Sequence, residues 1–243
     1  MCMPSEDKFK EIVEKLLEWF NGNGRKFPWR TVNDPYVILV TEFLLQRTKA
    51  EVVERTYYEF FSKYPTIESL AYSNTTDLRK FFSNLGLLYR GERLKMIAEE
   101  ILEKYGGTIP CEMEALLKLR GVGVYIASAV LNFGCDVPTP VVDKNVLRVL
   151  NRLGGIVRET VARHVILKLY RYGNNRKIAY ALIDIGAITC LENPRCAACP
   201  LDDICPKFPL QKSEWRMLRK IVKKDGSTEL REQPVVRKKS YRT

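Results

Sequence analysis

The sequence lacks the long apolar runs that a membrane span requires. A spanning helix needs about 20 consecutive apolar residues, whereas uninterrupted aliphatic runs here are short pieces such as Val37–Val40. The first residues, MCMPSEDKFKEIVEK, also lack the apolar core of a secretory signal peptide. We therefore expect a soluble intracellular protein, in the cytoplasm or nucleoid, with no membrane partner.

Histidine is almost absent, and the cysteines do not form an obvious disulfide pattern. His164 is the single histidine, and we expect it to be a surface or helix-end residue, not a catalytic base. Seven cysteines are present, with Cys2, Cys111 and Cys135 scattered. Because intracellular thiols stay reduced and the number is odd, a disulfide framework is not expected. Metal binding is the leading interpretation of the other four.

These four cysteines lie close together in the order Cys190-x5-Cys196-x2-Cys199-x5-Cys205. No histidine is interleaved, so ligation would be by thiolates alone. Four thiolates suit either a structural zinc ion or a [4Fe–4S] cluster, and the proline after Cys199 and after Cys205 is typical of cluster-binding runs. From the spacing alone the two alternatives stay open.

Charge is concentrated at one end of the chain. The formal net charge is +11, and residues 211–243 hold 11 Lys/Arg against 4 Asp/Glu, which is +7 of that total. A basic surplus attracts a polyanion. This segment is either a solvated tail or an extension that contacts DNA.

Strand-like alternation is scarce, and apolar stripes of helical period run through most of the chain. They cover residues 9–20, 35–46, 50–63, 92–104, 113–119, 125–133, 143–152, 160–170 and 177–190. Turn-forming residues such as Asn21–Gly24 and Gly154-Gly155 separate them. The predicted fold class is all-α with short connections.

Two glycines mark a tight turn between predicted helices in LLKLRGVGVYIASAVLNFG, residues 116–134. Gly121 and Gly123 allow backbone amides to point outward where the next helix begins, an arrangement that binds phosphate. A Gly-x-Gly turn alone is weak evidence. Further along, Asp143 precedes an apolar helix, where the usual role of an aspartate is that of an N-cap.

In this order the motifs resemble the endonuclease III and MutY superfamily of DNA glycosylases, over about residues 8–205. The shared features are a helix–hairpin–helix with a Leu-x-Gly-Val-Gly turn, an aspartate eighteen residues past Tyr125, and a four-cysteine loop. The first cysteine gap has five residues where the family usually has six. The resemblance favours a [4Fe–4S] cluster on the four cysteines over zinc.

The resemblance also implies two all-helical lobes with DNA in the cleft between them. A six-helix barrel containing the helix–hairpin–helix would span residues 27–133, and residues 1–26 with 134–210 would form the cluster lobe. Residues 211–243 would be a basic extension. The protein would act as a monomer on double-stranded DNA with a mismatched or damaged base, flipping the target nucleotide into the cleft.

Roles for the site residues follow from the same resemblance. Asp143 would stabilise the oxocarbenium-like sugar and orient water, while Glu42 or Tyr125 would donate a hydrogen bond or proton to the leaving base. The DNA-contacting residues would be Gln46, which fills the vacated space, Arg47, Leu87, Gly121 and Gly123. The alternatives are structural: an ion pair of Glu42, for instance with Arg47, and a buried glutamine that caps a helix at Gln46.

Position 125 decides the reaction class. Family members that also cleave the strand carry a lysine that attacks the sugar, whereas this chain has Tyr125. A phenol forms no Schiff base, which predicts a monofunctional hydrolase with little or no AP lyase activity. Lys118 and Lys144 are near enough in sequence to leave a weak residual reaction.

The substrate is predicted to be thymine or uracil mispaired with guanine, and two alternatives remain. Leu87 and the stretch Leu44–Thr48 resemble the mismatch enzymes, whereas Pro28-Trp29-Arg30 and Arg90-Gly91 are MutY-like. The first alternative is therefore a MutY-type adenine glycosylase acting on A:G or A:8-oxoguanine. The second is a catalytically silent DNA-binding iron–sulfur module, in which Asp143 is only a cap.

Overall fold

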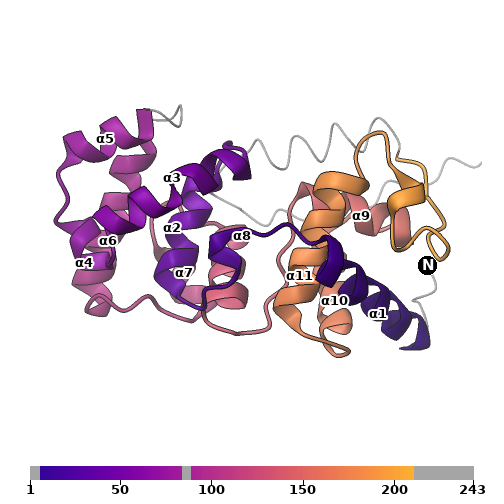
Figure 1. Cartoon of the computed structure of the whole chain (residues 1–243). Coiled ribbons are helices and arrows are strands. Elements are labelled where there is room, and N and C mark those ends of the chain that lie inside the picture. The colour runs from indigo at the N-terminus through magenta and orange to yellow at the C-terminus, as the bar shows by residue number, and fades with distance from the viewer. Residues whose placement is uncertain (1–5, 84–88, 211–243) are drawn as a thin grey trace, which may run out of the picture.

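The structure is a computed structural model, and it describes residues 6–83 and 89–210. Within these residues every regular element is helical, which confirms the all-α fold class (Figure 1). No helix in this part of the chain is long and apolar enough to cross a membrane. Predictions for Cys2, Leu87 and residues 211–243 lie outside the described residues.

One group of helices surrounds α2 (Pro35–Leu45), which is apolar on almost every face and is therefore buried. The Asp34 side chain caps it, since Oδ1 accepts from the amides of Tyr36 at 2.8 Å and Val37 at 3.3 Å. The other elements of this group are η1 (Pro28–Arg30), α3 (Ala50–Lys63), α4 (Ile67–Ala71), α5 (Thr75–Ser83), α6 (Tyr89–Tyr105), α7 (Met113–Lys118), α8 (Val124–Ala129) and the π-helical turn η2 (Val130–Gly134).

A second group of helices surrounds a separate core. Its elements are α1 (Glu6–Asn23), α9 (Lys144–Gly154), α10 (Glu159–Tyr170), α11 (Asn175–Asp184), the π-helical turn η3 (Ile185–Thr189) and η4 (Cys196–Ala198). Figure 1 shows the indigo α1 beside the orange α11 and α10, so the N-terminal helix joins the C-terminal helices. The two helix groups lie side by side along the molecule.

The chain passes from one core to the other between two adjacent residues. Val141 belongs to the first core and Val142 to the second, and both are buried. Asp143 follows directly and is partly exposed. The domain division predicted between residues 133 and 134 stays a prediction. In the structure, core-lining residues of the first group continue as far as Val141.

An ion pair joins the two groups. Asp184 of α11 is fully buried, and its carboxylate accepts from the backbone amide of Arg25 at 2.8 Å and from Arg25 Nε at 2.7 Å. Arg30 contributes two further bonds. From the sequence, Asp184 is expected to satisfy a neighbouring helix end; instead it binds two arginines from the segment between α1 and α2.

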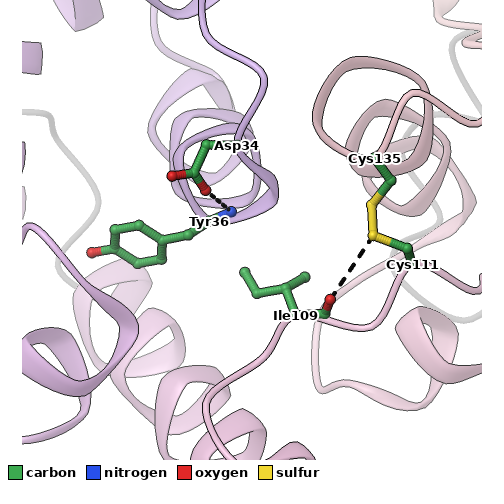
Figure 2. The surroundings of a disulfide bond; sticks show 5 residues. All are labelled: Asp34, Tyr36, Ile109, Cys111 and Cys135. Atoms are coloured by element: carbon green, nitrogen blue, oxygen red, sulfur yellow. Dashed lines mark hydrogen bonds between the residues drawn. A yellow bond between two sulfur atoms is a disulfide. The ribbon is translucent and has the colours of Figure 1, made fainter.

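The expectation that Cys111 and Cys135 stay unpaired is wrong in this structure. They form a disulfide with their Cα atoms 5.8 Å apart, beside the start of α2 (Figure 2). The reason is topological: α7, α8 and η2 carry the chain out and back, so residues separated by 24 positions meet. The disulfide therefore encloses the whole helix–hairpin–helix.

Candidate active site

Glu42 lies on the central helix α2 and is 8% exposed. Burial raises the pKa of its carboxyl to about 8, and the charge of Asp143 acts in the same direction, while Tyr125 and Arg30 oppose the rise. The carboxyl is therefore largely protonated at neutral pH and is able to donate a hydrogen bond or a proton. The cation that acts on Glu42 is Arg30, and not Arg47 as the sequence suggested.

Asp143 caps α9 and also faces Glu42 closely enough to influence it. Its Oδ1 accepts from the amide of Val146 at 2.7 Å, and its Oδ2 accepts from Asn145 Nδ2 at 3.1 Å. Burial raises the pKa of Asp143, while these N–H groups and Arg148 hold it down. The N-cap interpretation is thus confirmed. A carboxylate has about four acceptor positions, so capping leaves room for a second role.

Tyr125 stands in the first turn of α8 with its phenol beside the Glu42 carboxyl. Burial, followed by the charges of Glu42 and Asp143, raises the pKa of Tyr125 well above 10, so the phenol stays neutral. Tyr125 is partly exposed, as is Asp143. The three residues predicted to be catalytic are therefore brought together from α2, α8 and the start of α9.

The hairpin needs only one of its two glycines for conformational reasons. Gly121 has a φ of +76°, and a Cβ there would lie 2.7 Å from Cδ of Arg93. Gly123 has a φ of −92°, which any residue adopts, and a Cβ there would meet nothing within 4 Å. The turn itself is as predicted, with Gly123 as the N-cap residue of α8.

Gln46 and Arg47 form the turn that follows α2. Gln46 is the C-cap residue and is partly exposed, so it is not the buried cap that the structural alternative described. Arg47 is exposed and has a φ of +57°, a left-handed conformation that is uncommon for a residue other than glycine. Both side chains are at the end of the helix that carries Glu42.

Arg30 is a site residue that sequence reasoning missed. Its guanidinium lies 4.5 Å from the ring centroid of Tyr180, on α11, and it lowers the pKa of Glu42. The sequence marks Arg30 only as part of the MutY-like stretch Pro28-Trp29-Arg30 and not as a neighbour of Glu42, because its partners come from distant segments. His164, in contrast, is exposed on α10 with Nδ1 2.8 Å from the carbonyl oxygen of Thr160, as expected for a surface residue.

The four C-terminal cysteines line a single cavity formed by α9, η3 and the loop around η4. Burial raises the pKa of Cys199 to about 11, and the other three thiols add to this rise. Arg152 Nη1 donates to Cys190 Sγ at 3.2 Å. Among the described residues, no three His, Cys, Asp or Glu side chains are grouped closely enough to bind a single metal ion.

Comparison with known proteins places these features in a family. Residues 40–171 match the HhH-GPD superfamily of base excision DNA repair proteins. A thymine/uracil-DNA glycosylase of Methanothermobacter thermautotrophicus is 36% identical, over 83% of this chain and 95% of that protein. An adenine DNA glycosylase of Buchnera aphidicola is 31% identical, over 81% of this chain but 58% of that protein.

The fold agrees with the same relatives. The solved structure of a thermostable thymine-DNA glycosylase superposes with a TM-score of 0.77, at 33% identity, over 83% of this chain and 97% of that one. The matched region contains Glu42, the hairpin and Asp143. The chain therefore belongs to the HhH-GPD superfamily of base excision DNA repair proteins.

Proposed function

We propose that this protein is a monofunctional DNA glycosylase that hydrolyses the N-glycosidic bond of thymine or uracil mispaired with guanine. The observation that carries the proposal is the meeting of Glu42 and Asp143 where the two cores join, with Tyr125 beside them. Burial raises the pKa of both carboxyls, but Asp143 also accepts two N–H bonds that oppose the rise, and neighbouring carboxyls in unlike environments are able to divide acid and base roles between them. The thymine/uracil-DNA glycosylase relative supports the choice of substrate.

The chemistry divides between the two carboxyls. Asp143 accepts two N–H bonds that oppose the rise in its pKa caused by burial. We assign its carboxylate form the role of stabilising an oxocarbenium-like sugar and orienting the water that adds to it. Glu42 is protonated and donates to an oxygen of the departing pyrimidine. Tyr125 stays neutral and orients Glu42. It has no amine, so the abasic site is released without strand cleavage.

DNA contacts are assigned to the surroundings of this site. Gln46 would enter the space that the flipped nucleotide leaves, with Arg47 beside it. The hairpin at Gly121 and Gly123 would hold the phosphate backbone through its amides. The protein would do this as a monomer, and Leu87 would probe the opposite base.

The MutY-type alternative is supported by a weaker match. The adenine DNA glycosylase relative is matched over only 58% of its length, whereas the thymine/uracil enzyme is matched over 95%. The two substrates are separated by a direct assay. Purified protein is incubated with duplexes containing G:T, G:U, A:G or A:8-oxoguanine, and alkali then reveals abasic sites.

Asp143→Asn is the decisive variant, because asparagine caps a helix about as well as aspartate. We expect it to keep the cap bond to Val146 and the melting temperature, but to lose about 100-fold or more in base release. Asp203→Asn, which removes an exposed acid that pairs with Lys15, is the control. Release from A:G alone would support the adenine alternative. No release from any duplex would support the silent module.

We also propose that Cys190, Cys196, Cys199 and Cys205 bind a [4Fe–4S] cluster. The fit rests on the donor set: four thiols and no histidine around one cavity, with Arg152 donating to a sulfur. When bound, the cluster would hold residues 190–205 together as one loop beside α9. Iron and acid-labile sulfide analysis with a visible spectrum tests this, since a zinc site gives neither iron nor colour.

A further inference from the structure

The second residue of helix α6, Arg90, is completely buried. Arg90 is 0% exposed, and its guanidinium lies 5.7 Å from the ring centroid of Phe82. Nη1 donates to the carbonyl oxygens of Phe43 at 3.2 Å, Leu44 at 2.9 Å and Gln46 at 2.7 Å. One side chain therefore binds three carbonyl groups at the end of α2.

The same guanidinium continues into the turn beyond the helix. Nη1 and Nη2 each lie 3.1 Å from Thr48 Oγ1. Arg47, between the two bonded residues, has a φ of +57°. Such a backbone conformation is strained and persists only where the surroundings hold it. Arg90 is the group that spans the turn from Leu44 to Thr48.

Elementary electrostatics explains why a cation serves here. The last turn of a helix leaves about four carbonyl groups without partners, and the negative end of the helix dipole lies there. A planar guanidinium offers five donors in a fixed geometry, which a lysine does not. Arg90 therefore fixes both the direction in which α2 ends and the position of the Gln46 backbone.

We propose that Arg90 is a positioning residue for base flipping, an inference that rests on the function proposed above. It acts through Gln46, whose carbonyl it holds at 2.7 Å. If Gln46 enters the space vacated by the flipped nucleotide, its backbone has to be held in a fixed position relative to the DNA. Loss of Arg90 then slows extrusion of a paired base, and it leaves cleavage of an already unpaired base much less affected.

Helix α6 offers a matched control. Lys95 donates through Nζ to the carbonyl oxygens of Ala71 at 2.7 Å and Ser73 at 2.8 Å, at the end of α4. This is the same kind of contact from the same helix, made to a helix that carries no proposed site residue. Lys95→Met therefore reports the general cost of losing such a contact.

The experiment compares Arg90→Met, Arg90→Lys and Lys95→Met in single-turnover base release. One duplex carries uracil opposite guanine, and a second carries uracil opposite an abasic site, where no pairing has to be broken. We expect the rate of base release by Arg90→Met to fall about 10- to 100-fold on the first duplex. On the second duplex, the factor by which the rate falls is expected to be less than a third as large. Lys95→Met is expected to affect both duplexes equally, and Arg90→Lys to restore part of the lost rate.

A second readout follows extrusion directly. A 2-aminopurine placed beside a non-hydrolysable 2′-fluoro-uridine brightens when its neighbour leaves the stack, and the rate of brightening is expected to fall in Arg90→Met. If Arg90→Met does not fold, Thr48→Ala tests the inference in its place, because it removes only the hydroxyl acceptor of Arg90. We expect it to lose more rate on the first duplex than on the second, by a smaller factor than Arg90→Met. Equal losses on both duplexes would overturn the inference while leaving the proposed function in place. Wild-type protein inactive on every duplex would overturn both.

Discussion

Arg30 and Asp184 are joined by two parallel bonds, with Nη1 and Nη2 each 2.7 Å from a different carboxylate oxygen. The side chain of Asp184 is 0% exposed and that of Arg30 is 8% exposed. The same guanidinium lies over Tyr180 and lowers the pKa of Glu42. The ion pair that links the two helix groups is thus also a neighbour of the proposed active site.

Asp184→Asn is expected to destabilise the fold strongly. Removing one partner of a buried ion pair leaves an uncompensated charge, which costs about 3–5 kcal/mol, and here two arginines lose their carboxylate. For a chain of this size that corresponds to a fall in melting temperature of roughly 6–20 °C. Calorimetry measures it, with Asp203→Asn at the exposed Lys15 pair as a control of little effect. An equal fall in both variants would contradict the prediction.

Base release is expected to show a bell-shaped dependence on pH. Activity requires ionised Asp143, whose pKa is raised by burial, so the acidic limb lies above the range of an ordinary aspartate. It also requires protonated Glu42, so activity falls as the pH rises through about 8. In Glu42→Gln the side chain stays neutral at every pH, and the alkaline limb is expected to disappear from the profile of kcat/KM.

The same variant has a stability signature that catalysis does not affect. The pKa of Glu42 is about 8 in the folded state against an ordinary value of 4.5, so its contribution is favourable at low pH and is lost as the pH rises between these values. Glu42→Gln is therefore expected to gain in melting temperature relative to wild type over this interval. A constant difference across the pH range would show that the Glu42 carboxyl is not buried as described.

The sequence predicted the long helices and pointed to Glu42, Tyr125 and Asp143, whose catalytic roles stay predictions, but it did not predict the contacts between distant segments. Apolar stripes located α3 and α10 because each runs for several turns. Helix α4 was missed, since five residues carry no full period, although Thr66 and Ser69 form a capping box at its start. The roles of Arg30 and Arg90 depend on partners more than 40 residues away in sequence, for which local patterns carry no signal.

Loss of the Cys111–Cys135 disulfide is expected to loosen the helix–hairpin–helix. The closed loop spans 24 positions, and cross-linking a loop of this length stabilises a fold by about 3 kcal/mol in the chain-entropy description. Replacement of both cysteines by serine should lower the melting temperature by roughly 6–12 °C. The double variant should no longer respond to added reductant, whereas wild type should. Identical melting of oxidised and reduced wild type would contradict a stabilising disulfide.

Tyr125→Lys is expected to turn the hydrolase into a lyase. Position 125 is in the first turn of α8, beside Glu42 and within the electrostatic reach of Asp143, so an amine there would face the same sugar carbon that water attacks in the wild type. A neutral amine forms a Schiff base with the opened sugar, and strand cleavage follows.

The measurement is borohydride trapping on a duplex with a preformed abasic site, which does not depend on base release. Tyr125→Phe is the matched control and should give no adduct, and Lys118→Ala with Lys144→Ala should remove any residual adduct from wild type. If Tyr125→Lys binds the abasic duplex but is not trapped, position 125 does not face the sugar carbon, and the prediction is contradicted.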